Sequence, residues 1–419
     1  MENKRVPKVR FAEFSGEWMT RSLSELVDRV KSYSLSRSVE VNNFTGYKYI
    51  HYGDIHTKVA TVIDEGSVLP NIEAGDYDFL LNGDLVLADA SEDYQGIATP
   101  SVVTINTPYK LIAGLHTIAL RPKTTYSLFL YYMFFAEHFR RYGYKVGTGM
   151  KVFGISVTNI LRYEVGMPCQ QEQTKIGNFF KQLDEAITLQ QQELDSLKQT
   201  KQGFLQKLFP KEGESLPEVR FPDFSGEWEK NELGELMSVG SVKRIHQADW
   251  TSNGIRFFRA RDIVAKFKGE EIKEFLYISE ERYNKYAEAS GKVLVGDLLV
   301  TGVGTIGVPM LIENNDPIYF KDGNIIWFKN KNNLDGYFLY YSFVNNEIQK
   351  FVHDVAGTGT VGTYTIENGK RTPILFPSKQ EQTKIGNFFK QLDDTIALHE
   401  KELETLKETK KAFLQKMFV

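Results

Sequence analysis

The sequence predicts an α+β fold in which two mixed α/β domains are separated by two long helices that pair as an antiparallel coiled coil. The 419-residue chain is an internal tandem duplication with a period of about 210 residues, and this implies pseudo-two-fold symmetry. Each copy ends in a heptad pattern of apolar residues. Each copy also holds short strand-like runs punctuated by Gly, Asn and Pro, which is typical of a mixed domain.

The duplication is clearest at the two ends of each copy. Residues 6–18, VPKVRFAEFSGEW, return at 216–228 as LPEVRFPDFSGEW. Residues 171–209 return at 380–418 with 27 of 39 positions identical, and the first 14 of these residues are the same. Between these near-copies the sequence diverges. We therefore expect a repeated scaffold with two different surfaces, suited to reading two different things at a fixed separation.

The intervening segments, residues 19–167 and 229–377, have the pattern of mixed α/β domains. A short aromatic helix is expected at 127–135 and again at 336–344, and its rings are expected to pack in the core. The strand-like runs are Tyr47–Tyr52, Leu85–Ala88, Ser101–Ile105, Ile255–Ala260, Val293–Val300 and Ile325–Phe328.

The repeated segment at the end of each copy is predicted to be a long helix, because its apolar residues alternate at spacings of four and three. A helix of 39 residues spans about 58 Å, so a pair could act as a ruler. The pattern alone leaves a simple linker or a homodimerising coiled coil open. The seam residues are Ile176, Phe180, Leu183, Ile187, Leu194, Leu197, Phe204 and Leu208, then Ile385, Phe389, Leu392, Ile396, Leu403, Leu406, Phe413 and Met417.

Composition narrows the class of protein. With 42% hydrophobic and 25% charged residues, the chain is expected to be soluble and globular. A single cysteine, Cys169, excludes an internal disulfide and fits a reducing compartment, so we expect a cytoplasmic protein without a membrane role. Basic and acidic residues number 23 and 23 in residues 1–209, and 28 and 31 in residues 210–419. This balance weighs against a non-specific polyanion binder.

The sequence contains fragments of catalytic motifs, but none lies in the sequence context that its chemistry requires. Residues 302–307, GVGTIG, are followed by no helix, and residues 357–362, GTGTVG, lack the Lys-Ser/Thr of a phosphate loop. Asp316-Pro317-Ile318-Tyr319 differs by one residue from the motif that grips adenine in amino-methyltransferases, but no cofactor motif accompanies it. The seven histidines show no metal-ligand spacing. We therefore expect a non-catalytic recognition subunit.

The repeated motifs also carry a family likeness over essentially the whole chain. They are the PxVRFxxFSGEW opening of each half, the GDLxL strands at 83–87 and 296–300, the Gly-Thr-Gly loops and the EQxKIGxFFxxLD helix starts. With these motifs the chain resembles the DNA specificity subunit of type I restriction-modification systems. The resemblance implies two target recognition domains, each reading one half of an asymmetric, interrupted site in double-stranded DNA.

The resemblance also implies a division of the chain and a set of partners. Residues 1–169 and 210–377 would hold the target recognition domains, and residues 170–209 and 378–419 the helices that space them and dock two methyltransferase subunits. The chain would need no cofactor of its own, since S-adenosylmethionine, ATP and magnesium would belong to the methyltransferase and motor-nuclease subunits. The helix residues assigned to coiled-coil pairing and docking are Ile176, Phe180, Leu183, Ile187, Leu194, Leu197, Ile385, Phe389, Leu392, Ile396, Leu403 and Leu406.

Three segments in each domain offer side chains suited to contacting bases or phosphates. They are the strand near residue 48 or 256, the loop after the GDL motif, and the Gly-Thr-Gly loop. The alternative is that the strand charges only extend into water and the loops are ordinary turns. The candidates are Lys48, His51, Ser91, Gln95, Thr148 and Lys151 in the first half, and Arg256, Arg259, Arg261, Thr301, Thr305, Thr358, Thr360 and Thr363 in the second.

Two other functions remain open from the sequence. The chain could be a self-sufficient adenine methyltransferase with degenerate motifs, which would bind S-adenosylmethionine by itself. It could also be a coiled-coil scaffold without affinity for DNA.

Overall fold

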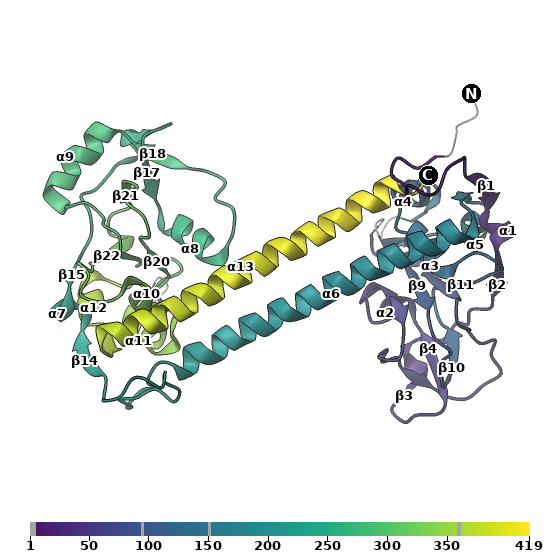
Figure 1. The fold of residues 1–419 in the computed structure, drawn as a ribbon, viewed down its shortest axis with the longest axis horizontal. Helices are drawn as coiled ribbons and strands as arrows, with labels where there is room; N and C mark the ends of the chain where they lie inside the picture. The colour runs from purple at the N-terminus through teal and green to yellow at the C-terminus, as the bar shows by residue number, and fades with distance from the viewer. Residues whose placement is uncertain (1–5, 94–95, 150–151, 358–361) are drawn as a thin grey trace. The chain divides into compact units, whose positions relative to one another are not determined.

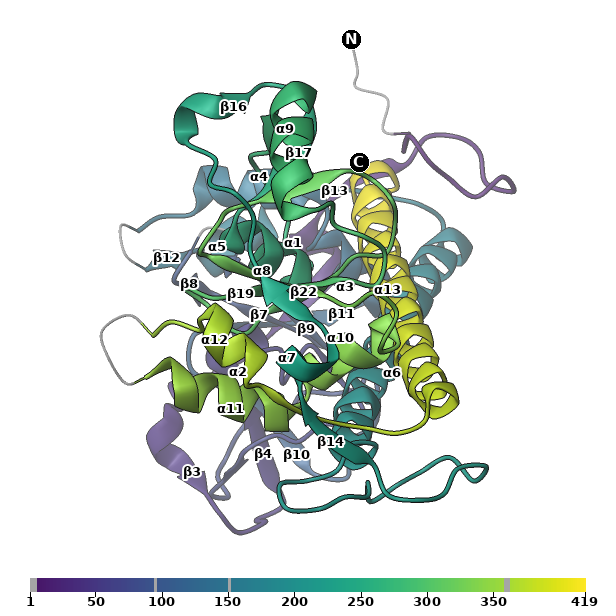
Figure 2. The same cartoon turned by 90° about the vertical axis from the view of Figure 1, so that its left-hand side faces the viewer.

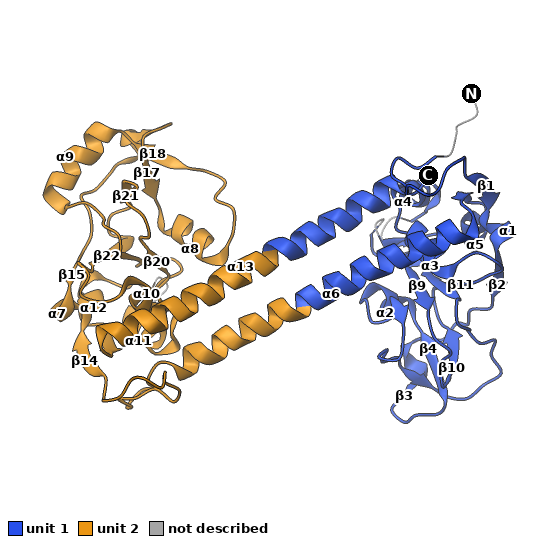
Figure 3. Cartoon of the chain, in the orientation of Figure 1, with its two compact units in different colours: residues 1–191, 401–419 blue, residues 192–400 orange. Residues whose placement is uncertain are grey.

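The structure is a computed structural model that describes residues 6–93, 96–149, 152–357 and 362–419. The chain forms two compact units (Figure 3). Unit 1 contains residues 1–191 and 401–419, and unit 2 contains residues 192–400. The chain passes from unit 1 to unit 2 within helix α6, Gln170–Lys207, and returns within helix α13, Lys379–Lys416.

Unit 1 is built on two mixed sheets with short helices beside them (Figure 1). One sheet has the order β2 (Val27–Val30), β11 (Thr117–Pro122), β7 (Leu85–Ala88), β9 (Pro100–Val103) and β5 (Val62–Ile63). The other has the order β10 (Lys110–Ala113), β4 (Tyr47–Ile50), β6 (Asn71–Ile72) and β3 (Glu40–Val41). Two ribbons join β1 (Met19–Ser22) to β13 (Glu164–Met167) and β8 (Ala90–Ser91) to β12 (Phe153–Gly154). The helices are α1 (Leu23–Leu26), α2 (Tyr52–His56), α3 (Ser127–Met133), α4 (Glu137–Val146) and α5 (Val157–Leu161).

Unit 2 repeats this plan with different details (Figure 2). One sheet has the order β15 (Ser238–Gly240), β22 (Ile325–Lys329), β19 (Leu298–Thr301) and β20 (Pro309–Leu311). The other has the order β16 (Trp250–Thr251), β18 (Leu276–Ile278), β17 (Ile255–Phe258) and β21 (Ile318–Phe320). A ribbon joins β14 (Glu229–Glu232) to β23 (Pro373–Phe376). The helices are α7 (Leu233–Leu236), α8 (Ala260–Lys268), α9 (Glu280–Ser290), α10 (Gly336–Val344), α11 (Asn346–Ala356) and α12 (Ile366–Lys370).

The long helices pair antiparallel within each unit, which confirms the predicted arrangement. In unit 1 Lys410 of α13 pairs with Asp184 of α6, and Gln190 Nε2 donates to Glu402 Oε2 at 2.9 Å. As residue numbers rise along α6, the numbers of the residues that they contact in α13 fall, as expected of antiparallel helices. In unit 2 Lys201 pairs with Asp393 at 2.5 Å, and Phe204 packs edge-on against Phe388 at 5.1 Å.

The predicted seam residues of both helices are buried or half-buried. The start of the seam does more than join two helices, since Ile176 and Phe180 pack in the core of unit 1 with Phe129 of α3. Ile385 and Phe389 pack in the corresponding core of unit 2. Because these side chains contact the rest of their own unit, a docked partner would have to use other faces of the helices.

The repeated opening motif ties the two helices of each unit together. Arg10 Nε and Nη2 donate to both carboxylate oxygens of Glu172, at 2.6 and 2.7 Å, close to the start of α6. The Val9 amide donates to the Lys416 carbonyl at 3.1 Å, at the end of α13. The second copy repeats this clamp, with Arg220 on Glu381 at 2.7 Å for both bonds. The VRF motif thus holds the start of one long helix beside the end of the other.

The aromatic helices α3 and α10 occur where the sequence predicts them, and their rings are core residues. Each also sends one tyrosine hydroxyl to the helix pair. Tyr132 donates to Asp184 at 2.9 Å, and Tyr341 donates to Asp393 at 2.7 Å. Burial first, and then the nearby aspartate, raises the pKa of each tyrosine, so the hydroxyl keeps its proton and stays a donor.

Candidate nucleic-acid interface

The first candidate segment ends its strand earlier than predicted in both units. The expected strands to Tyr52 and Ala260 stop at Ile50 and Phe258, and a helix begins two residues later. The cause is a carboxylate three residues into the turn. The His51 amide donates to Asp54 Oδ2 at 2.9 Å, and the Arg259 amide donates to Asp262 Oδ2 at 2.8 Å.

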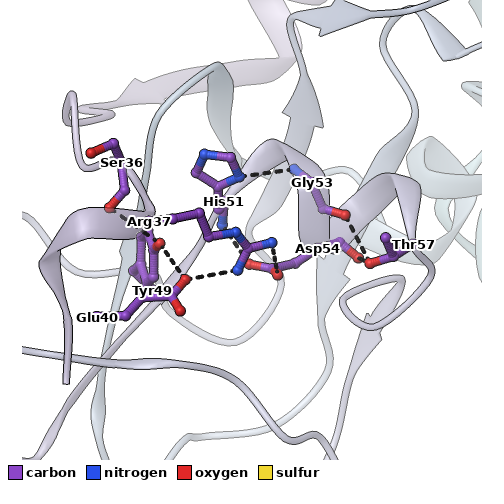
Figure 4. A network of polar contacts seen from close by, with 8 residues as sticks. All are labelled: Ser36, Arg37, Glu40, Tyr49, His51, Gly53, Asp54 and Thr57. Carbon is purple, nitrogen blue, oxygen red and sulfur yellow. Dashed lines mark hydrogen bonds and ion pairs between the residues drawn. The ribbon is translucent and has the colours of Figure 1, made fainter. Parts of the chain in front are cut away.

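In unit 1 the buried Asp54 belongs to a polar network (Figure 4). Arg37 donates to Asp54 at 2.7 Å and to Glu40 at 2.8 Å, and Tyr49 also donates to Glu40 at 2.8 Å. His51 caps the helix, because its Nδ1 accepts the Gly53 amide at 3.1 Å. Burial, and then Arg37, lowers the pKa of His51, so the neutral ring is favoured. The side chain of His51 is therefore used inside unit 1.

In unit 2 Arg259 stands where unit 1 has His51 and supplies the guanidinium itself. It donates to both oxygens of Asp262, at 2.9 and 3.0 Å, and to Glu274 Oε2 at 2.9 Å. Arg261 is much more exposed and shares the same Glu274 oxygen at 2.7 Å. Arg259 thus closes the turn, whereas Arg261 lies on the surface and is better placed to meet a ligand.

Lys48 and Arg256 occupy the same strand position but differ in their partners. Lys48 Nζ donates to the Leu69 carbonyl at 2.7 Å and lies 5.3 Å from the Tyr109 ring. Arg256 makes only one long hydrogen bond, 3.4 Å from Nη1 to the Leu276 carbonyl, among the residues that the structure describes. Burial lowers the pKa of Arg256. The ammonium group of Lys48 thus has a partner within unit 1, whereas the guanidinium of Arg256 keeps N–H donors without an acceptor.

The loop residues divide into internal and exposed groups. Ser91 is buried in β8, and Thr301 is fully buried, with its hydroxyl donating to the Thr305 carbonyl at 2.5 Å. Thr305 and Thr148 are exposed, and Thr363 is half-buried. Gln95, Lys151, Thr358 and Thr360 lie outside the described residues. Among the described loop candidates, Thr148 and Thr305 are the most accessible to a ligand.

The three candidate segments of unit 1 come together. His56 of α2 donates from Nε2 to the Ala90 carbonyl at 2.8 Å, next to Ser91 in β8. Strand β8 pairs with β12, and Gly154 of β12 forms a bridge with Thr148, whose amide donates to it at 2.9 Å. The strand-to-helix turn, the GDL loop and the Gly-Thr-Gly loop therefore meet through these contacts.

Unit 2 joins two of its segments in a related way. The Tyr364 amide, next to Thr363, donates to the Gly302 carbonyl at 2.8 Å, next to Thr301. Gly302 has no room for a side chain here, since a Cβ atom would stand 2.6 Å from the Tyr364 carbonyl oxygen. The glycine in this loop thus permits a close crossing of two backbones.

The structure adds residues that sequence reasoning did not single out. In unit 1 Tyr52 lies between the rings of His51, His56 and His116, and His116 pairs with Asp89 at 3.1 Å. Burial raises the pKa of Asp89, against the opposing effect of His116. These residues are up to 65 positions apart, and no local motif links them, so only the fold brings them together. In unit 2 the exposed Phe275 beside Arg256 was also missed.

Two features that would point to other kinds of site were sought in the described part of the chain. Among these residues, no group of three or more His, Cys, Asp or Glu side chains is placed to hold a metal ion. No helix in the same ranges is long and apolar enough to span a membrane.

Known proteins give consistent matches. The family model "Type I restriction modification DNA specificity domain" matches residues 15–199 and again residues 225–408. The MjaX specificity subunit of Methanocaldococcus jannaschii, named as a putative type I restriction enzyme subunit, is 20% identical over 99% of this chain and 95% of its own length. The MjaVIII specificity subunit of the same organism is 23% identical over 60% of each protein, so the match spans somewhat less than two thirds of that relative.

Solved structures share the fold. The S subunit of a type I restriction-modification system from M. genitalium has a TM-score of 0.60 at 15% identity, covering 99% of both chains. A chain from a structure of type I R-M complex assembly and conformational transition has a TM-score of 0.54, also at 15% identity, and covers 95% of this chain and 96% of its own. Since the two matches of the family model together cover most of the sequence, this chain belongs to the type I restriction-modification DNA specificity domain family.

Proposed function

We propose that this chain is the non-catalytic DNA sequence-recognition subunit of a type I restriction-modification complex. Each unit would read one half of an asymmetric, interrupted site and direct adenine methylation by partner subunits. The observation that carries the proposal is a contrast within the duplication. The clamps Arg10–Glu172 and Arg220–Glu381 are the same, whereas the turns at His51 and Arg259 are built differently.

This contrast is what two readers on one scaffold require. The scaffold must hold its geometry, so its clamps repeat, and the reading surfaces must differ, because the two half-sites differ. Direct readout depends on the donors and acceptors presented to base edges. Arg261 and Thr305 in unit 2 and Thr148 in unit 1 are exposed and polar, and they remain candidates for such contacts.

We also propose that two methyltransferase subunits dock on the long helices, one on each copy of a repeated stripe. In α6 the stripe is Gln171, Lys175, Asn178, Gln182 and Leu189, with spacings of four, three, four and seven that keep it on one helix face. The counterparts in α13 are Gln380, Lys384, Asn387, Gln391 and Leu398. All ten are exposed, and each pair is identical.

Other exposed positions of the same helices differ between the copies, such as Gln199 against Glu408 and Gln202 against Lys411. Solvent alone does not require identical side chains, since most surface substitutions change stability little. Lys175 and Asn178 also contact their own unit, through Glu13 and the Tyr126 hydroxyl. For the other identical pairs, the exposed leucines above all, two copies of one partner are the best explanation. In the assembled complex S-adenosylmethionine, ATP and magnesium would be held by the partner subunits, and cytoplasmic DNA would be the target.

The proposed division of the chain follows from the same reasoning. Residues 1–169 and 210–377 would be the target recognition domains, and residues 170–209 and 378–419 the spacing and docking helices. A self-sufficient methyltransferase is the competing function. It predicts that the isolated chain binds S-adenosylmethionine in equilibrium dialysis, and we expect no binding.

Methylation mapping tests the proposed function. The methyltransferase is expressed alone, and then with this chain, in cells whose DNA is mapped by single-molecule sequencing. The proposal predicts one asymmetric, interrupted motif with methyladenine on both strands only when this chain is present. If both proteins form a stable complex and no new motif appears, the reader role is wrong, and a scaffold role would then be tested by DNA mobility shift.

A further inference from the structure

One face of the β16–β18–β17–β21 sheet in unit 2 carries an unusual set of side chains. Ile255 and Phe257 of β17 point into the core, and alternation places Arg256 on the opposite face together with Phe258, which is half-buried and still packs against the edge of the same core cluster. Arg256 pairs in register with Tyr277 of β18, and Phe275 lies on the same face just before that strand. A face turned from the core is normally polar, but this one presents three aromatic rings around one cation.

The rings hold the guanidinium. Its central carbon lies 4.1 Å from the centroid of Phe275, 5.0 Å from Phe258 and 5.9 Å from Tyr277. Phe275 is 55% exposed, so the most closely stacked ring is open to solvent on its other side. Stacking on rings fixes the plane of an arginine without using its hydrogen-bond donors.

The hydrogen-bond donors of Arg256 are poorly satisfied for a structural arginine. Nη2 of Arg256 is buried without a hydrogen-bond partner among the described residues, and Nη1 has only its 3.4 Å contact. The neighbouring Arg259 and Arg261 both pair with Glu274. A buried donor without an acceptor destabilises the folded protein, so this one needs an explanation. An acceptor supplied by a bound ligand would be such an explanation.

Unit 1 does not repeat this arrangement. At the matching position Lys48 donates to the Leu69 carbonyl. Only one ring, that of Tyr109, lies near the Lys48 ammonium among the described residues, at 5.3 Å. The ring-held arginine is thus specific to unit 2, as expected of a feature that distinguishes one half-site from the other.

An arginine stacked on an exposed phenylalanine suits nucleic acid. The ring offers a face or wedge to a base, and the guanidinium offers donors to a guanine edge or a phosphate. We infer that Arg256 and Phe275 form a specificity-determining DNA contact of unit 2. This inference rests on the proposed function and names the residues through which one half-site is read. On binding, Phe275 stacks on or between bases, and the guanidinium of Arg256, whose Nη2 is buried in the free chain, turns outward to gain the acceptor that it lacks there.

The test uses the chain assembled with its methyltransferase. The DNA target is first mapped for the wild type, and its affinity is then measured with a duplex bearing that target. The variants are Phe275→Ala, Phe275→Tyr and Arg256→Lys. Phe267→Ala is the matched control, since Phe267 is 45% exposed on α8 and no cation lies over its ring in the described ranges.

We expect Phe275→Ala to weaken binding by about tenfold, the scale of one lost base–aromatic stack, and Phe275→Tyr to restore it. Arg256→Lys is expected to relax the methylated motif at one position in one half-site and to leave the other half unchanged, because lysine lacks the planar, two-donor fork. Phe267→Ala should behave as the wild type. Thermal unfolding of each variant shows whether the fold is intact.

Wild-type affinity and an unaltered motif in folded Phe275→Ala and Arg256→Lys complexes would overturn the inference. So would relaxation of both half-sites together, or an equal effect of Phe267→Ala. Failure of the proposed function is distinguishable, because it appears already in the wild type as the absence of any motif dependent on this chain.

Discussion

The carboxylates of Asp54 and Asp262 do the same work with different partners. Each accepts the backbone amide that opens a helix, and each is paired with a guanidinium. In unit 2 the guanidinium belongs to the capping residue, Arg259, whereas in unit 1 it comes from Arg37 and the cap is His51. Divergence between the copies has therefore preserved the electrostatics of the turn while changing which side chains surround it.

This arrangement predicts a pH effect at His51. Burial and then Arg37 lower the pKa of its ring from 6.5, so the unfolded chain binds the proton more readily than the folded one. Folding stability should therefore rise with pH through about 6.5 and fall below it. Asn caps helices without titrating. We expect His51→Asn to flatten the pH dependence of the unfolding free energy between about pH 5 and 7, as measured by urea titration. Equal slopes for the two proteins would contradict this account.

At the scale of elements, each aromatic helix is fixed to the helix pair by a tyrosine, an aspartate and a lysine. Tyr132 donates to Asp184, which also pairs with Lys410, and the same set recurs as Tyr341, Asp393 and Lys201. The lysines occupy polar positions of otherwise apolar seams. These contacts join three segments that are far apart in the sequence.

Asp184→Asn should remove the charge that both neighbours use. We expect it to lower the unfolding free energy by about 1.5–3 kcal/mol, as for hydrogen bonds to charged groups. The matched control is Glu185→Gln, on the same helix, which loses only an exposed pair with Lys181 and should cost under about 0.5 kcal/mol. Chemical denaturation of the full chain provides the comparison, and equal losses for both variants would refute the role of the aspartate.

The long helices and the duplication could be predicted because their patterns are local and repeated. Pairing of distant strands could not, as for β4 with β10, whose paired residues Tyr47 and Lys110 lie 63 positions apart. The early ends of β4 and β17 were missed because the caps that follow them, histidine and arginine, are unusual. For the candidate site, the sequence indicates which segments carry polar side chains, but it does not indicate which of these side chains are exposed. Ser91 and Thr301 are buried, whereas Phe275 is exposed.

At the scale of the whole molecule, the repeated stripes on α6 and α13 predict two partner subunits per chain. Leu189→Asp should remove one of them, and the double variant with Leu398→Asp should remove both, since each leucine is more than half exposed in an identical setting. Native mass spectrometry of the complex counts the subunits. The control is Gln199→Glu, which introduces the residue of the other copy at an exposed, divergent position. Loss of both partners from Leu189→Asp alone would contradict separate docking.

The central claim is that the two units read separate halves of one DNA site, and exchange of one reader tests it most directly. Residues 19–167 are replaced by the corresponding segment of a family member with a different target, and the methylated motif is mapped in cells that also express the methyltransferase. The account predicts a motif in which one half is new and the other half and the spacing are unchanged. A motif altered in both halves would show that the units do not read independently.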